Sequence, residues 1–560
     1  MIRGTQPAAA GQPHWWQRGV IYQVYVRSFH DTGGDGVGDL AGVIDKLGYL
    51  GWLGVDALWL TPFYPSPMKD FGYDVADYTN VDPLFGDLAT FDRLLAEAHR
   101  QRIKVIVDYV PNHTSSEHPW FLQSRSSRAN PKRDWYIWRD PKGPEGTPGA
   151  PPNNWLSMFG GSAWDWDAAT GQYYLHSFLK AQPDLNWRNP EVEAAMFDVA
   201  RFWLERGVDG FRIDVAHFIM KDPMLRDNPP DPDPDPAAIR SLGAWATQLH
   251  LYDLAHPDVH RVYRAFRQLL DSYSADQPRI SIGELDDRNM TIWAGYYGAQ
   301  LDELHMPFNF HLLGVDWNAR VVRAVVDAVE AALPAGAWPN WVLGNHDRPR
   351  VASRVGRAQA RVAMLLLLTL RGTPTLYYGD ELGMTNRVVP PERVRDPWER
   401  QVPRLGRDPQ RTPMQWDSGP NAGFCLPEAA PWLPIADDYE RVNVAVQAED
   451  PRSMLALTRR LLALRRGSPA LSVGHYRRIE GMPDDCFVYI RHIAEQRMLA
   501  ALNFSPSKRV LNLPEGMRGT IRISTHAHRD GELVAGRLRL RGDEGCVLEL
   551  NTGGAHRAIA

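Results

Sequence analysis

The stretch GVDGFRIDVAHF, residues 207–218, combines a buried strand with two charged side chains. Apolar residues occupy every second position from Phe211 to Val215, as in a strand that is packed on both sides. Arg212 and Asp214 lie between them. Because burying a charge costs much free energy, a strand covered on both faces carries two charges only where they have a use. The stretch therefore predicts a buried β-strand with functional charged residues at its carboxyl end.

Similar apolar runs recur along the chain and alternate with helical patterns. In residues 90–102 the apolar side chains fall at i, i+3, i+4 and i+7, which is the spacing of one helix face. Residues 189–207 begin with Asn-Pro and end with glycine, which are typical start and stop signals of a helix. Repeated strand–helix units predict an α/β fold, a closed (β/α)8 TIM barrel. The eight predicted strands are 19–29, 55–62, 103–113, 208–215, 279–284, 303–312, 340–347 and 373–381.

Two interruptions and one change of pattern divide the chain. Residues 114–180 are rich in Trp, Pro, Gly and Asn and are too long for a simple loop, so we expect a small subdomain inserted after the third strand. An Asp-Pro repeat within 226–240 predicts a stiff, solvated excursion after the fourth strand. Past residue 470 the pattern becomes period-2 strands and turns, which predicts an antiparallel β domain at 473–560. The barrel then comprises residues 1–113 and 181–472.

The composition excludes several classes of function. A formal net charge of -5 gives no electrostatic case for nucleic acid or an anionic membrane as a partner. Three widely spaced cysteines argue against a disulfide framework or a zinc site. The amino terminus lacks the apolar segment of a signal peptide, and the most apolar run, 364–370, is too short to span a bilayer. We expect a soluble cytoplasmic protein.

Unusual polar residues fall where the predicted strands end. In a barrel of this type the active site lies at the carboxyl ends of the strands. Carboxylates from separate strands would then meet at the same end of the barrel. Because their mutual repulsion costs stability, such a cluster indicates a functional site. The residues that close or follow the strands are Asp74, His113, Arg212, Asp214, Glu284, His346 and Asp347.

Glycoside hydrolysis fits this set of carboxylates. The chain has no nucleotide-binding G-x-x-x-x-G-K-[ST] run and no H-E-x-x-H zinc motif. One carboxyl must protonate a leaving oxygen, while another attacks an oxocarbenium-like carbon or activates water against it. Asp214 is expected to be an ionised nucleophile whose pKa is lowered by Arg212 on the same face. Glu284 must instead hold a proton near neutral pH, which an enclosed site with anionic neighbours favours.

Several motifs resemble the signature regions of the α-amylase family of glycoside hydrolases, and two others look like its oligo-1,6-glucosidase and α-glucosidase branch. The resemblance runs from about residue 15 to the C-terminal β domain, in the family's order. It implies a barrel with a subdomain after the third strand and a C-terminal β-sandwich. The signature motifs are DYVPNH (108–113), GFRIDVAH (210–217), GE (283–284) and NHD (345–347), and the branch motifs are QPDLN (182–186) and RTPMQWD (411–417).

Matched residue by residue, the resemblance implies catalytic roles and a closed pocket. Asp214 matches the nucleophile, Glu284 the acid/base, and Asp347 the third carboxylate, which grips the sugar hydroxyls and distorts the ring. Asp74 and Arg411 match the pair that closes the pocket behind the non-reducing end, which would make the enzyme exo-acting on short chains. The residues matched to the terminal glucose are His113, Arg212 and His346 as hydrogen-bonding groups, Tyr73 as a stacking platform and Phe178 as an aromatic wall.

The loop DTGGDGVGD has the spacing of a site for a hard cation. Asp31, Asp35 and Asp39 stand at positions 1, 5 and 9, and the carbonyl oxygen of Val37 is available at position 7. Gly33 stands where the family's loop usually has asparagine, which removes one side-chain ligand. The alternative is a glycine-rich turn with solvated aspartates. We expect structural calcium or, as a second choice, magnesium, and no cofactor for the chemistry.

The predicted function is a retaining, exo-acting α-glucosidase whose partner is a small oligosaccharide or disaccharide substrate. Val215 follows the nucleophile, and in this branch valine there is associated with α-1,6 cleavage, so isomaltose-type links are expected beside α-1,4 links. Trehalose synthase, sucrose-acting enzymes and transglucosylases remain alternatives, because they use the same three carboxylates and differ in the acceptor. A non-enzymatic transporter heavy chain is disfavoured, because those proteins carry a membrane helix and typically lack an intact catalytic set.

Overall fold

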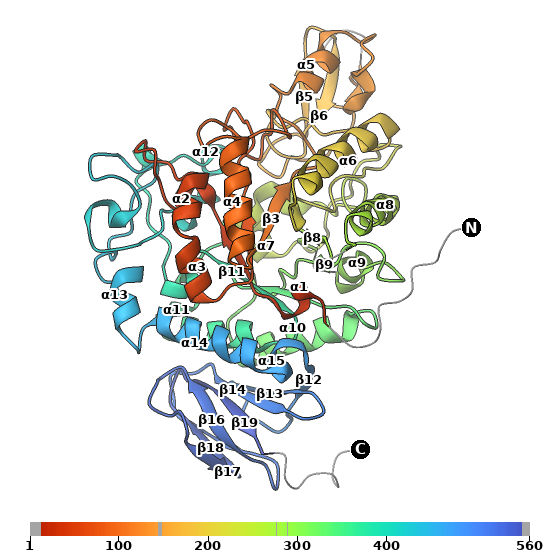
Figure 1. The fold of residues 1–560 in the computed structure, drawn as a ribbon. Coiled ribbons are helices and arrows are strands. Elements are labelled where there is room, and N and C mark those ends of the chain that lie inside the picture. The colour runs from red at the N-terminus through yellow and green to blue at the C-terminus, as the bar shows by residue number, and fades with distance from the viewer. Residues whose placement is uncertain (1–12, 144–147, 276, 288, 552–560) are drawn as a thin grey trace.

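The computed structural model describes residues 13–143, 148–275, 277–287 and 289–551, and its centre is a barrel of parallel strands (Figure 1). The eight strands form one sheet in the order β10-β11-β1-β2-β3-β7-β8-β9, and each strand is parallel to its neighbours in this order. The strands are β1 Ile21–Val24, β2 Ala57–Leu60, β3 Lys104–Tyr109, β7 Gly210–Ile213, β8 Ile280–Gly283, β9 Met306–Pro307, β10 Asn340–Val342 and β11 Thr373–Tyr377.

Burial explains why these segments read as near-continuous apolar runs. Every residue of β1, β2, β7, β8 and β11 is buried, as in parallel strands that are covered by helices outside and by side chains inside. This arrangement confirms the predicted fold class. The helices that surround the barrel are α2 Leu40–Asp45, α3 Leu47–Leu53, α4 Leu88–Arg100, α6 Pro190–Glu205, α8 Val259–Ser272, α9 Met290–Gly295, α10 Ala319–Ala332 and α11 Val351–Thr369.

Two insertions interrupt the barrel, and the first, with α5, β5 and β6, lies at the top of Figure 1. The first contains a three-stranded sheet in the order β4-β6-β5 and the helix α5. The second follows β7 and contains α7 and a 3-10 helix, η3. Their bounds are α5 Pro119–Ser126, β4 Trp138–Arg139, β5 Trp164–Asp167, β6 Gln172–Leu175, α7 Pro236–Leu242 and η3 Gly243–Thr247.

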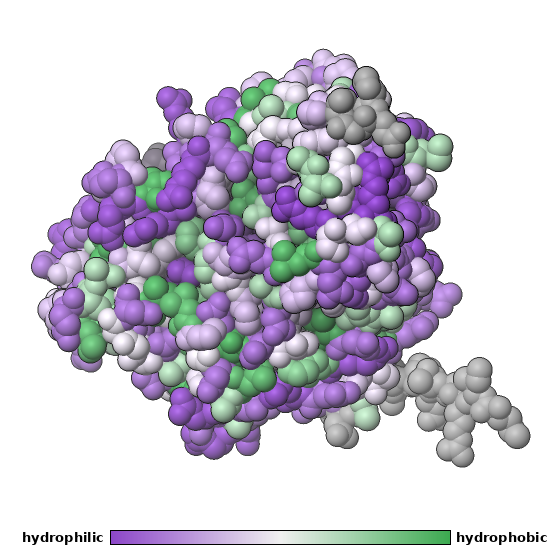
Figure 2. All heavy atoms as spheres, turned by 90° about the horizontal axis from the view of Figure 1, so that it is seen from above, coloured by the Kyte–Doolittle hydropathy of each residue, from purple (hydrophilic) through white to green (hydrophobic). Residues whose placement is uncertain are grey.

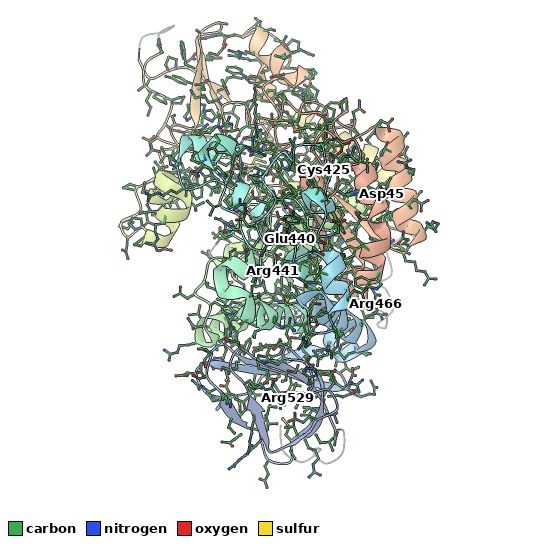
Figure 3. All side chains as sticks on the ribbon, turned by 90° about the vertical axis from the view of Figure 1, so that its left-hand side faces the viewer. Asp45, Cys425, Glu440, Arg441, Arg466 and Arg529 are labelled. Atoms are coloured by element: carbon green, nitrogen blue, oxygen red, sulfur yellow. The ribbon has the colours of Figure 1, made fainter. Side chains whose placement is uncertain are left out.

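Short helices connect the last barrel strand to the C-terminal domain. In Figure 3, Arg466 marks the longest of them, α14, above the C-terminal strands, and Arg529 lies within the C-terminal domain. No helix in the described part of the chain is long and apolar enough to cross a membrane. These helices are η4 Asp380–Leu382, η5 Pro391–Arg393, α12 Pro397–Gln401, η6 Asp408–Gln410, η7 Pro420–Gly423, α13 Val444–Glu449, α14 Met454–Gly467 and α15 Pro469–Val473.

The C-terminal domain consists of antiparallel sheets. One has the order β12-β13-β14-β19-β16-β17, and the other pairs β15 with β18. Alternating burial along β16 and β18 matches the predicted period-2 pattern. The strands are β12 His475–Arg478, β13 Cys486–His492, β14 Arg497–Asn503, β15 Arg509–Asn512, β16 Arg518–Ser524, β17 Leu533–Ala535, β18 Arg537–Leu540 and β19 Gly545–Leu550.

Two buried arginines join the C-terminal domain and α14 to the barrel through backbone oxygens. Arg491, in β13, donates to the carbonyl of Thr369 at the end of α11 at 2.7 Å and to that of Gly474 at 2.8 Å. Arg465, in α14, donates to the carbonyl of Gly372 just before β11 at 2.5 Å. Both guanidinium groups thus satisfy carbonyls of the turn that leads into the last barrel strand.

Candidate active site

The carboxyl ends of the barrel strands open into one cavity of about 830 Å³. Asp214 follows β7, Glu284 follows β8 and Asp347 lies in the loop after β10, and all three line this cavity. Figure 2 shows the molecule from this side, where hydrophilic residues cover most of the surface and hydrophobic residues form separate small groups. The structure therefore brings together the three carboxylates predicted from the sequence. Tyr73, His113, Phe178 and Val215 also line the cavity, as predicted.

One guanidinium group joins three carboxylates at this end of the barrel. Arg212 is fully buried, and its Nη1 donates to Asp108 and to Asp214, each at 2.7 Å. Its Nη2 donates to Glu284 at 2.5 Å. The motifs do not single out Asp108, although it gives the same signal as Asp214, a charge within an apolar strand. Arg212 thus fixes the relative position of Asp214 and Glu284.

The two carboxyl oxygens of Glu284 have different surroundings. Oε2 accepts from Arg212 and, at 3.1 Å, from the backbone N–H of Val215. No donor among the described residues is found on Oε1, so this oxygen can carry a proton. Val215 has a left-handed backbone conformation, with φ 38°, which a β-branched residue adopts only under strain. The N–H of this strained turn donates to Oε2 and so leaves Oε1 as the oxygen that can hold the proton of Glu284.

Asp214 and Glu284 share a site that disfavours two negative charges. Burial raises the pKa of Asp214 well above its usual range, while Arg212 opposes this rise and Glu284 adds to it. Burial also raises the pKa of Glu284, again with Arg212 opposing and Asp347 adding. The predicted lowering of the pKa of Asp214 by Arg212 is present as one contribution, but burial outweighs it. Because the two carboxyls interact, they titrate as a unit, and burial favours the states in which this unit keeps a proton.

Asp347 is kept ionised by two further arginines. Its Oδ1 accepts from Arg411 at 2.7 Å and from Arg407 at 3.3 Å. Burial alone would raise the pKa of Asp347, but His346 and the two guanidinium groups hold it well below the usual range. Burial lowers the pKa of His346 well below its usual value, so near neutral pH its imidazole is neutral and the guanidinium groups of Arg411 and Arg407 carry the positive charge beside Asp347. One ionised carboxylate beside a pair that holds a proton gives the site both the charge and the acid that glycoside chemistry needs.

Asp74 does not line the cavity, and its predicted pairing with Arg411 is wrong. Asp74 is fully buried, and its carboxylate accepts from the hydroxyl of Ser66 and from the backbone N–H groups of Lys69 and Asp70, each at 2.9 Å. Arg411 binds Asp347 instead. Asp74 therefore stabilises the turn that precedes it and has no free oxygen facing a ligand.

The Asp–Arg pair that lines the cavity is Asp70 with Arg407. The Nη2 of Arg407 donates to Asp70 at 2.6 Å, and both side chains line the cavity. The same Nη2 donates to buried Asp396 at 2.8 Å, which holds the guanidinium in place. Each member of the pair lies four positions before the residue chosen by motif, Asp74 or Arg411. Arg407 lies just before the motif RTPMQWD, and only the folded loops show which of these aspartates and arginines face the cavity.

Aromatic rings and neutral polar groups complete the inner end of the cavity. Tyr73 stacks on His346 with ring centroids 5.4 Å apart and 3° between the ring planes. Gln182 Nε2 lies 3.1 Å from both Asp70 Oδ2 and His113 Nε2. Burial lowers the pKa of His113 to about 4, so its imidazole is neutral at neutral pH. The lining residues that the motifs did not assign include Asp70, Phe159, Gln182, Trp398 and Arg407.

The predicted calcium loop is held by hydrogen bonds to its own backbone. Asp31 accepts two backbone N–H groups within the loop, and Asp39 caps the amino end of α2. Asp35 accepts the backbone N–H of Val37 at 2.8 Å. No group of three or more His, Cys, Asp or Glu side chains that could hold a metal ion is found within the described ranges. These contacts match a glycine-rich turn and give no complete ligand set, and calcium binding by Asp31, Asp35, Val37 and Asp39 stays a prediction.

Comparisons with known proteins agree with this geometry. Residues 23–474 match the family model of the alpha amylase catalytic domain. The chain is 44% identical over 513 residues to a probable alpha-glucosidase of Rhizobium meliloti (strain 1021), covering 89% of this chain and 91% of that protein. It is 37% identical to an oligo-1,6-glucosidase of Parageobacillus thermoglucosidasius, covering 90% and 92% of the two chains. The crystal structure of the alpha-glucosyl transfer enzyme XgtA superimposes with a TM-score of 0.89 at 42% identity, over 96% of this chain and 100% of that one. The chain belongs to the α-amylase family of glycoside hydrolases and is an enzyme of that family.

Proposed function

We propose that this enzyme is a retaining, exo-acting α-glucosidase that releases glucose from the non-reducing end of short α-1,6- and α-1,4-linked glucosides. The observation that carries the proposal is the binding of Asp214 and Glu284 to the two terminal nitrogens of one guanidinium, Arg212. This arrangement supports a carboxyl separation of about 5 to 5.5 Å, as in retaining enzymes, over the 6.5 to 9.5 Å of inverting enzymes. The buried Asp70–Arg407 ion pair supports exo-action, because an ion pair in the cavity lining would stop a longer chain from passing that point.

The proposed reaction uses each carboxyl once in each half-reaction. Glu284 donates its proton to the glycosidic oxygen while Asp214 attacks the anomeric carbon, so the glycosidic bond breaks and a β-glucosyl ester forms. Glu284, now ionised, takes a proton from water as the water oxygen attacks the same carbon. The ester bond breaks, α-glucose leaves, and both carboxyls return to their starting states. Ionised Asp347 stabilises positive charge on the ring in both transition states.

The stereochemistry of the product tests this proposal directly. We expect ¹H NMR of a fresh reaction on maltose to show α-glucose as the first-formed product from the non-reducing end. β-Glucose as that product would contradict the assignment of Asp214 as a nucleophile. Initial rates on maltose, isomaltose, sucrose and trehalose then separate the α-glucosidase from trehalose synthase and sucrose-acting alternatives, which give isomerised or transferred products.

Linkage preference is expected to depend on Val215. Val215 lines the cavity next to Asp214, and threonine is nearly isosteric but adds a hydroxyl that can bond an acceptor hydroxyl or ordered water. We predict that Val215→Thr raises the maltose-to-isomaltose ratio of kcat/KM by about tenfold, the scale of one polar contact in a specificity site. A ratio that does not move, or a wild-type enzyme that ignores isomaltose, would refute the linkage prediction and leave the α-glucosidase proposal standing.

A further inference from the structure

We propose that a second cavity, at the amino ends of β3, β7 and β8, binds a phosphate group, either as inorganic phosphate or as part of a phosphomonoester. This cavity has a volume of about 280 Å³. It lies at the opposite end of β7 and β8 from Asp214 and Glu284, so the inference is independent of the proposed function. Its lining includes His99, Lys104, Asp209, Gln277 and Arg279.

The charged groups of this cavity leave an excess of positive charge. Asp209 Oδ1 accepts from the ammonium of Lys104 at 3.0 Å and from Nη1 of Arg279 at 3.2 Å. Asp209 Oδ2 lies 2.6 Å from Nε2 of His99 and accepts the backbone N–H of Val105 at 2.9 Å. Asp209 is the only acidic residue among the described residues that line the cavity. Its one negative charge faces two permanent cations, and protonation of His99 would add a third.

The two cations also keep hydrogen-bond donors that the protein does not use. An ammonium has three N–H groups and a guanidinium has five. Within the described part of the chain, Asp209 is the one hydrogen-bond acceptor of the Lys104 side chain and of the Arg279 side chain. These side chains are 20% and 21% exposed, so their remaining donors can be reached from solvent. A ligand with several acceptor oxygens could therefore bind them without breaking the contacts to Asp209.

A phosphate group fits this combination of charge, donors and size. Because Lys104 and Arg279 donate to the same oxygen of Asp209, their charged groups lie side by side, and one tetrahedral oxyanion can accept from both. Asp209 is only 1% exposed and its two oxygens are already hydrogen-bonded, so it offers no surface to the ligand. The volume lies just below the range of about 300 to 1,000 Å³ of sites for drug-sized ligands, which favours a small anion over a nucleotide.

Titration of the full chain with inorganic phosphate at low ionic strength, followed by ³¹P NMR or calorimetry, tests the proposal. We expect saturable binding that weakens as sodium chloride is added, because salt screens the partly exposed cations. Glucose 6-phosphate and glucose identify the source of the phosphate group. Tighter binding of glucose 6-phosphate than of phosphate would make a phosphomonoester the ligand, and the reverse order would make it inorganic phosphate. Absence of saturable phosphate binding, or equal affinity for the monoanion acetate, would overturn the proposal.

Substitutions in the lining locate the bound phosphate. Gln277 is exposed at the cavity, so Gln277→Glu adds a negative charge there without removing an ion pair, and we expect it to weaken phosphate binding by about fivefold or more, the scale of one charge repulsion at about 4 Å in water. Lys104→Gln should weaken binding to a similar extent. The matched control is Gln123→Glu, at an exposed position of α5, which makes the same change in net charge and should leave the Kd within about twofold. Unchanged phosphate affinity in Gln277→Glu and Lys104→Gln, or an equal loss in Gln123→Glu, would overturn the proposed site.

Discussion

The two ends of strand β7 carry opposite arrangements of charge. Just before the strand, the carboxylate of Asp209 accepts from His99 at 2.6 Å, Lys104 at 3.0 Å and Arg279 at 3.2 Å. At its carboxyl end, the guanidinium of Arg212 instead donates to three carboxylates. One end thus has one anion among several cationic groups, and the other has one cation among several anions.

The difference in solvent exposure shows why one end stabilises the fold and the other does chemistry. The basic partners of Asp209 are partly exposed, at 20% for Lys104 and 21% for Arg279, so water screens their excess charge. The side chains that meet Arg212 are nearly inaccessible, at 0% for Asp108 and 8% for Asp214. Burial, with the excess negative charge adding to it, therefore raises the pKa values of Asp214 and Glu284 there, which favours proton transfer. In barrels of this type the amino-terminal end supports stability and the carboxyl end supports catalysis.

Removing Asp214, the proposed nucleophile, should give the largest effect. Asp214→Ala is expected to lower kcat by at least about 10⁴-fold, the scale for loss of a catalytic group. The melting temperature should stay the same or rise, because Glu284 and Asp347 lose a like-charged neighbour while Arg212 keeps two partners. Retained turnover, or a large fall in the melting temperature, would contradict the division between the two ends.

Removing the carboxylate at the other end should have the opposite signature. Asp209→Asn leaves Lys104 and Arg279 without their buried partner, and we expect a loss of about 3 kcal/mol in the free energy of unfolding. The value of kcat/KM measured well below the melting temperature should change little. Denaturant unfolding and initial rates on the same preparation check both statements. An Asp209→Asn variant with full stability and reduced activity would contradict the assignment of a stabilising role to this end of β7.

The two ends should also respond to opposite limits of pH. Burial alone would raise the pKa of Asp209, but His99, Lys104 and the Val105 N–H together lower it. The stabilisation that Asp209 provides is therefore present above its unfolded-state pKa of about 3.9 and is lost as pH falls through the folded-state pKa. Glu284, as the proposed acid, must be protonated. Burial raises its pKa above the usual value of about 4.3, so kcat/KM should fall as pH rises through this raised pKa.

A pH profile in wild type and Asp209→Asn separates these effects. The alkaline limb of kcat/KM should be the same in both proteins, while the acid loss of stability should be smaller in the variant. An alkaline limb near about 4.3 would show that the site does not raise the pKa of Glu284.

The smallest expected effect concerns a third charged cluster, the loop that contains Asp31, Asp35 and Asp39. Its carboxylates are held by backbone N–H groups and not by basic side chains. If calcium binds there, EDTA should lower the melting temperature and added calcium should restore it, because the ion binds the folded state. Rates at moderate temperature should barely change. A melting temperature that is insensitive to both additions would favour the turn alone.

Sequence was sufficient for the parts of the molecule that depend on local pattern. The alternation of apolar runs with helix faces predicted the barrel, and the charges of Arg212 and Asp214 inside such a run led to the cavity. The choice of Asp74 over Asp70 failed because both lie in one short loop, and the motif does not show which carboxylate the turn itself uses. The expected lowering of the pKa of Asp214 is wrong for a similar reason, since the direction of the shift depends on how deeply the folded chain buries the carboxyl.

The contacts of Arg491 have a consequence for the order in which the molecule is made. The carbonyl of Thr369, at the turn into the last barrel strand, is satisfied by a side chain 122 residues further along the chain. On the ribosome that turn emerges long before its partner, so this carbonyl lacks its native donor until β13 of the C-terminal domain has been synthesised. Barrel and C-terminal domain should consequently melt together, in a single calorimetric transition, and a chain that stops after α15 should fail to mature even though it contains every residue of the active site.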